Sequence, residues 1–121
     1  MHKLRAKLDY HSIWCVAWTD KGLCDYLFSL IPKYYYPQRP KYQAHITVVS
    51  KYDADNRDMS LWGKYQDEVV EVEYDPVLRR YGEYFGITCY SQRLKEIRRE
   101  LGLTELMGGN IDFHLTIGNT K

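Results

Sequence analysis

The sequence carries almost no excess charge of either sign. Its 17 Lys and Arg and 16 Asp and Glu leave a formal net charge of +1. Proteins that bind long duplex nucleic acid usually have a strong basic excess, so the balance argues against that class of function. A small anionic ligand stays open, because a local cationic loop is enough to attract one.

Cysteine is scarce, and long hydrophobic runs are absent. Cys15, Cys24 and Cys89 form an odd, scattered set without a CxxC pair. They fit reduced, mostly buried thiols in a cytoplasmic protein better than a disulfide framework. No run approaches the length of a membrane-spanning helix, and the first residues lead into no apolar signal core. We therefore expect a cytoplasmic protein with no membrane partner.

What remains is the composition of a globular domain. The 121 residues are 45% hydrophobic and 27% charged, which predicts one domain spanning residues 1–121. Apolar runs and alternation predict strands at Leu8–Trp18, Ala44–Val48, Val70–Tyr74, Glu83–Tyr90 and Phe113–Ile117. Helical spacing predicts one helix after Thr19 or Asp20, ending before Pro32, and another between Ser91 and Gly102.

Two of the expected strands repeat a three-residue motif, His-x-Thr. Ala44–Val48 contains His45 and Thr47, and Phe113–Ile117 contains His114 and Thr116. With four His and six Thr in the chain, chance predicts about 0.2 occurrences of the motif. Because side chains alternate between the faces of a strand, each copy places an imidazole and a hydroxyl opposite an apolar face. Two such pairs facing one cleft would make a site.

The motifs end two similar stretches of chain. Strand, helix, loop and His-x-Thr strand occur in the same order twice, with the helices starting 25 residues before His45 and 23 residues before His114. Two copies suggest pseudo-twofold lobes, roughly 1–60 and 61–121, around a shared cleft. We expect an α+β fold with largely antiparallel sheets and helices packed outside them.

This arrangement resembles the 2H phosphoesterases, whose mark is a pair of apolar-His-x-Thr-apolar strands. That family includes RNA cyclic phosphodiesterases, enzymes that cut 2′,5′-linked oligoadenylates, and phage enzymes that destroy cyclic oligonucleotide immune signals. The interval of 69 residues from His45 to His114 looks most like that of the small phage members, which would act in the host cytoplasm. The chain is short for the family, and only five residues follow Thr116, so a C-terminal lid over the substrate has no counterpart.

The resemblance implies that His45 and His114 divide the roles of general base and general acid at a phosphodiester. Histidine in general titrates near pH 6.5, so a neutral and a protonated imidazole can coexist at working pH. One would take a proton from a 2′-hydroxyl or water, and the other would protonate the leaving oxygen. Thr47 and Thr116 would donate hydrogen bonds to the non-bridging oxygens. This chemistry requires no metal or cofactor, and the substrate class is a small RNA-type or cyclic oligonucleotide.

Substrate-binding candidates stand directly before the first motif: Tyr34, Tyr35, Tyr36, Arg39 and Lys41. Aromatic faces stack on bases and cations attract phosphate, although a Pro-rich loop whose tyrosines cover the core fits equally well. For Tyr10, Tyr84 and Tyr90 we expect the core rather than the cleft. We expect Arg79 and Arg80 in a solvated turn.

Two other classes of function stay open. A metal hydrolase would combine the histidines with carboxylates such as Asp9 or Asp112, but the sequence has no His-x-x-x-His or similar ligand spacing. Asp112 shares the face of His114 and Thr116, which allows an orienting role. A binding protein that sequesters a nucleotide without cutting it is the non-enzymatic alternative.

Overall fold

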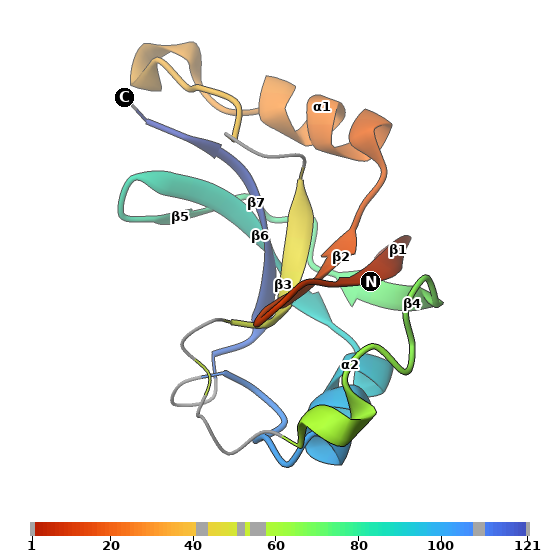
Figure 1. Cartoon of the computed structure of the whole chain (residues 1–121). Helices are drawn as coiled ribbons and strands as arrows, with labels where there is room; N and C mark the ends of the chain where they lie inside the picture. The colour runs from red at the N-terminus through yellow and green to blue at the C-terminus, as the bar shows by residue number, and fades with distance from the viewer. Residues whose placement is uncertain (1, 41–43, 51–52, 54–57, 108–110, 121) are drawn as a thin grey trace.

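The chain folds around a closed antiparallel sheet (Figure 1). The computed structural model describes residues 2–40, 44–50, 53, 58–107 and 111–120. Its strands are β1 (His2–Tyr10), β2 (Cys15–Trp18), β3 (His45–Val49), β4 (Val69–Tyr74), β5 (Arg79–Tyr81), β6 (Tyr84–Tyr90) and β7 (Phe113–Asn119). They lie in the order β4-β1-β2-β3-β7-β6-β5, and an additional β4–β6 pairing closes six of them into a barrel. The expected α+β class with antiparallel sheets is confirmed.

Alternation along the strands fills the barrel. On β3, Ile46 and Val48 are fully buried, while His45 and Thr47 are half-buried. β7 repeats the pattern with Phe113, Leu115 and Ile117. Because successive side chains point to opposite faces, one face of each strand supplies the core and the other supplies the barrel's outer surface. The outer surface of β3 and β7 therefore carries the histidines and threonines.

Two α-helices lie at opposite ends of the barrel (Figure 1): α1 (Lys21–Ser29) against β7, and α2 (Gln92–Glu100) against β3 and β4. The Asp20 side chain caps α1 and the Ser91 side chain caps α2, each accepting from the backbone N–H three residues later. Gly102, at φ 78°, ends the second helix. Short 3-10 turns occupy Lys33–Tyr35 and Met59–Leu61.

The expected strand Leu8–Trp18 is wrong. The segment is the end of β1, a turn and β2, with Tyr10 paired to Cys15 and the His11 N–H donating to the Trp14 carbonyl at 2.8 Å. The turn separates two strands whose buried faces are Leu4, Ala6 and Leu8, and Cys15 and Ala17. Alternation from His2 onward marks β1, but the continuous apolar run after Ser12 hid the break.

The expected turn at Arg79 and Arg80 is wrong, although both side chains are exposed as expected. Both residues belong to β5, which pairs with the start of β6 through a hairpin over Gly82 and Glu83. β4 pairs with the end of the same strand. β6 thus divides one edge between two partners, and the hairpin projects beyond the barrel next to β7.

The repeated order of elements expected from the sequence is present. β2-α1-β3 and β6-α2-β7 each run strand, helix and antiparallel neighbouring strand. The last strand of one unit pairs with the last strand of the other, so β3 and β7 are adjacent. Both motifs therefore lie on neighbouring strands.

Candidate functional site

The β3–β7 pairing assembles the two motifs into one group. Ile46 is paired with Leu115 and both side chains are fully buried. In an antiparallel pair the residues on either side of such a position face their counterparts across the ladder. This places an imidazole opposite a hydroxyl on each side of the buried pair. We call the four half-buried residues the His–Thr quartet: His45, Thr47, His114 and Thr116.

The four side chains of the quartet share one face of the β3–β7 pair. His45 is opposite Thr116, and Thr47 is opposite His114, so the two imidazoles stand on a diagonal. Diagonal neighbours on one face of an antiparallel pair are roughly 7–8 Å apart. A tetrahedral group seated between them would have an imidazole on two sides and a hydroxyl on the other two.

An aromatic contact and a carboxylate support His45. Trp18 is its cross-strand neighbour, with ring centroids 5.3 Å apart and the planes at 74°. The indole N–H donates to Asp9 Oδ2 at 2.8 Å, and Gln66 donates to Oδ1 at 3.0 Å. These hydrogen bonds, the one from Trp18 above all, lower the pKa of Asp9. The ionised carboxylate therefore holds the indole at the edge of the quartet.

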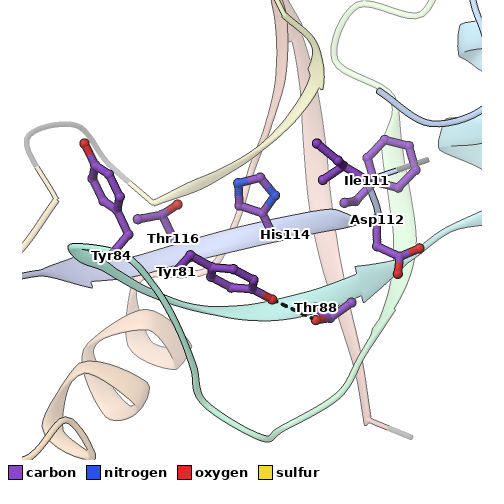
Figure 2. A pocket seen from close by; sticks show the side chains of 8 residues that line it. Tyr81, Tyr84, Thr88, Ile111, Asp112, His114 and Thr116 are labelled. Atoms are coloured by element: carbon purple, nitrogen blue, oxygen red, sulfur yellow. Dashed lines mark hydrogen bonds between the residues drawn. The ribbon is translucent and has the colours of Figure 1, made fainter. Parts of the chain in front are cut away.

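A cavity of about 500 Å³ opens beside His114 on the outer surface of β6 and β7 (Figure 2). Its lining residues are Tyr81, Tyr84, Thr88, Ile111, Asp112, Phe113, His114 and Thr116. In Figure 2 the Tyr81 ring runs below the His114 imidazole, with centroids 6.1 Å apart, and its hydroxyl lies 3.2 Å from Thr88 Oγ1. Half of the quartet thus faces this cavity.

Gly86 lets β6 approach β7 next to Thr116. The pairing shifts register between Phe85 and Gly86, so that Gly86 is opposite Thr116. A Cβ added at Gly86 would lie 2.7 Å from the Leu115 carbonyl oxygen. Since that contact is with backbone, the β7 chain itself would have to move. Gly86 was not predicted as a site residue. A glycine inside an apolar strand is nevertheless a sequence signal for a bulge or a close approach.

Replacing Gly86 by alanine is therefore expected to displace the Leu115–Thr116 backbone. We expect the free energy of unfolding to fall by about 1–3 kcal/mol, the usual range for overpacking. Urea denaturation of the variant measures the loss. Gly63 has open space around its Cβ position but a φ of 85°, so Gly63→Asn, which tolerates a left-handed backbone, is the control. Unchanged stability in Gly86→Ala would contradict the close approach.

A buried arginine links α2 to β3 and to the segment that follows the helix. Arg98 of α2 is 0% exposed and makes a bidentate ion pair with Asp53, at 2.9 Å for each contact. The same guanidinium donates to the carbonyls of Val48 at 2.8 Å and Thr104 at 2.7 Å. Val48 follows Thr47 on β3, and Thr104 begins the segment that leads to β7. Arg98 thus connects β3, directly after Thr47, with the segment that precedes β7 in the sequence.

The predicted substrate-binding residues lie mainly around α1 and β6. Tyr34 and Tyr36 are 72% and 79% exposed. Tyr35 packs on Phe85 at 5.3 Å between centroids. Arg39 forms an ion pair with Asp25 and covers the Phe28 ring. Lys41 lies outside the described residues.

The loop that carries these tyrosines is fixed next to β7. Gln38 exchanges both backbone hydrogen bonds with Asn119, at 2.7 and 2.9 Å. Tyr35 thereby covers the core, which the sequence analysis kept as the alternative. The tyrosines that line the cavity, Tyr81 and Tyr84, come instead from the β5–β6 hairpin. The expectation that Tyr84 lies in the core is wrong, because its side chain is 56% exposed and lines the cavity.

The other candidate groups lie elsewhere. Cys15, Cys24 and Cys89 are buried and free, and burial raises the pKa of Cys15 and of Cys89 to about 12. Within the described ranges, no three His, Cys, Asp or Glu side chains gather as a metal-binding group. The helices of the described chain include none long and apolar enough to cross a membrane.

Comparison of the chain with family models, curated proteins and solved structures gave no match. A function can therefore be inferred only from the geometry of the quartet and of the cavity beside it.

Proposed function

We propose that the protein is a phosphodiesterase of the 2H type that cleaves a small RNA-type or cyclic oligonucleotide without a metal ion. The observation that carries the proposal is the pairing of Ile46 with Leu115, from which the juxtaposition of the two His-x-Thr motifs follows. The repeated β2-α1-β3 and β6-α2-β7 units support the two-lobed organisation of that family. Candidate linkages are 2′,5′-linkages, 2′,3′-cyclic phosphates and cyclic oligonucleotides of the kind used as immune signals.

The reaction needs one neutral and one protonated imidazole. The neutral ring takes the proton of the ribose hydroxyl next to the phosphate, and that oxygen bonds to phosphorus. The bond from phosphorus to the leaving oxygen breaks, and the protonated ring gives that oxygen a proton. Where the substrate is a 2′,3′-cyclic phosphate, water replaces the ribose hydroxyl.

The threonines act on the charge that moves during this step. As the bond to the leaving oxygen breaks, charge shifts on the non-bridging oxygens, and hydroxyl donors fixed at that place stabilise the transition state. Thr47 lies across from His114, and Thr116 lies across from His45. A phosphate between the two strands would therefore receive one hydroxyl hydrogen bond from each strand.

One panel of substrates tests the proposal. Wild-type protein is incubated with a 2′,3′-cyclic nucleotide, a 2′,5′-linked dinucleotide and a cyclic dinucleotide, and the products are separated by HPLC. We expect cleavage of at least one substrate. An internal linkage without the adjacent ribose hydroxyl should stay intact, since the nucleophile is missing. Ligand that is bound but recovered intact from every reaction would contradict catalysis and favour sequestration.

The activity is expected to show a bell-shaped dependence of kcat/KM on pH. Protonation of the base lowers kcat/KM on the acid side, and loss of the proton from the acid lowers it on the alkaline side. The values should be the same with and without EDTA. Loss of activity in EDTA that a divalent metal restores would support the metal hydrolase instead.

Removing one threonine hydroxyl is expected to reduce kcat by about 10- to 1,000-fold, in line with the loss of an oxyanion donor. Thr47→Val and Thr116→Val keep the branched shape that suits a strand. KM should change less than kcat, because the hydrogen bonds strengthen in the transition state. Thr120→Val, outside the quartet, is the control. A change in KM alone would assign the hydroxyls to substrate binding.

A further inference from the structure

The cavity beside His114 combines aromatic rings with one carboxylate. Tyr81 and Tyr84 supply the rings, Thr88 supplies a hydroxyl and Asp112 supplies the charge. Among its described lining residues there is no Lys or Arg. A group that carries negative charge is therefore disfavoured there, and the phosphate has to stay at the quartet.

A neutral, planar group with N–H donors fits this lining. The volume of about 500 Å³ is within the range of small-molecule sites and has room for a nucleobase. Stacking of a base on an aromatic side chain contributes about 1–3 kcal/mol. Figure 2 shows Tyr84 at one end of the cavity and Asp112 with Ile111 at the other, with His114 between them.

The carboxylate lies where it would meet the edge of such a base. Asp112 lies directly before β7, two residues before His114, and lines the cavity (Figure 2). Among the described residues, the exposed Asp112 side chain has no hydrogen-bond or ion-pair partner. Its two oxygens therefore remain available to a ligand.

The hydrogen-bond pattern of the four bases decides which edge fits best. A carboxylate only accepts, and its two oxygens match two parallel N–H donors. Guanine offers such a pair at N1–H and N2–H. Adenine and cytosine offer an amino group next to an acceptor nitrogen, and uracil offers one N–H between two carbonyls. Only guanine presents adjacent donors without an acceptor facing the carboxylate.

We propose that this cavity binds a guanine base of the substrate, with Asp112 accepting from N1–H and N2–H and the tyrosine rings stacking on its face. The proposal rests on the proposed function for placing the phosphate at the quartet. It gives the enzyme a preference for guanine next to the bond that is cut.

Binding of GMP and IMP to a catalytically silent protein tests the proposal separately from turnover. IMP lacks only the N2 amino group, so the pair isolates one of the two hydrogen bonds. In the His45→Ala variant, which keeps every lining residue of the cavity, followed by NMR titration, we expect GMP to bind at least about 10-fold more tightly than IMP. Shifts should concentrate at Thr88 and at the backbone of residues 111–116.

Two variants identify the groups responsible. Asp112→Asn should bring the ratio of GMP to IMP affinity close to one, because an amide cannot accept both donors. Tyr84→Ala should weaken the binding of both nucleotides and leave the ratio of GMP to IMP affinity high. Glu71→Gln, an exposed carboxylate on β4 paired with Lys3, is the matched control and should keep the wild-type ratio.

Equal affinities for GMP and IMP, a ratio that survives Asp112→Asn, or shifts confined to another surface would overturn the assignment. Each result is independent of cleavage. If the protein binds GMP as expected but cuts no substrate in the panel, the cavity assignment stands and the catalytic proposal fails. If it cuts RNA-type substrates without preference for guanine, the reverse holds.

Discussion

Replacing His45 or His114 by alanine is expected to lower kcat by about 10²- to 10⁴-fold in each case, the usual contribution of a positioned acid or base. The physical reason is that each imidazole transfers a proton that the leaving group or the nucleophile cannot exchange with water quickly enough. Single-turnover kinetics on the best substrate of the panel measure the effect, since they separate the chemical step from product release.

The two histidines act in one step, so their effects should not add. The double variant is expected to be little slower than the worse single variant, as groups that work as a unit behave. His2→Ala is the matched control. That side chain stacks on Tyr74 with centroids 5.4 Å apart, at the start of β1, and is not part of the quartet. Full activity of His45→Ala would refute the two-histidine mechanism.

The candidate site follows closely from the sequence, because its signals are local. A His-x-Thr motif inside an apolar alternating segment fixes which residues share a face, and His45 and Thr47 do leave the barrel on the side opposite Ile46. The helix caps Asp20 and Ser91 are equally local, since a cap bonds to the first turn of its own helix. What alternation cannot supply is the neighbour of each strand.

The cavity depends on pairings between distant segments, which is why the sequence analysis missed it. Tyr84 enters it because β5 turns back on β6 through the Gly82–Glu83 hairpin. Thr88 enters it because β6 pairs with β7 at His114. Nothing within a few residues of Tyr84 distinguishes a cavity tyrosine from a core tyrosine. The tyrosine-rich run before β3, which is conspicuous in composition, instead folds around α1 and the end of β7.

Arg98 was missed for a different reason. The residue stands four after Leu94 and three before Leu101, so helical spacing puts it on the same stripe as these buried leucines. A charged residue at such a position signals a buried ion pair, but the partner, 45 residues earlier, has no local mark. A single cation within an otherwise apolar helical stripe is the sequence pattern that would have identified Arg98 as buried.

Replacing Arg98 by methionine is expected to lower the free energy of unfolding by about 3–5 kcal/mol, because it leaves the Asp53 carboxylate buried without its cation. The side chain of Asp53 is only 10% exposed, and the carbonyls of Val48 and Thr104 would lose their donor as well. For a domain of this size the loss corresponds to a fall of about 10–20 °C in Tm. Urea denaturation followed by circular dichroism measures it.

The neighbouring arginine provides the control for this prediction. Arg99 is 51% exposed and its closest ion-pair contact, with Glu105, is 4.0 Å, so Arg99→Met should stay within about 0.5 kcal/mol of wild type. If Arg98→Met does not fold, Asp53→Asn gives a milder form of the same test, since the amide still accepts one hydrogen bond from the guanidinium. A loss below about 1 kcal/mol in both variants would contradict the ion pair. Arg98 donates directly to the carbonyl of Val48, the residue after Thr47. The expected loss would therefore show that this ion pair stabilises the part of β3 that carries half of the quartet.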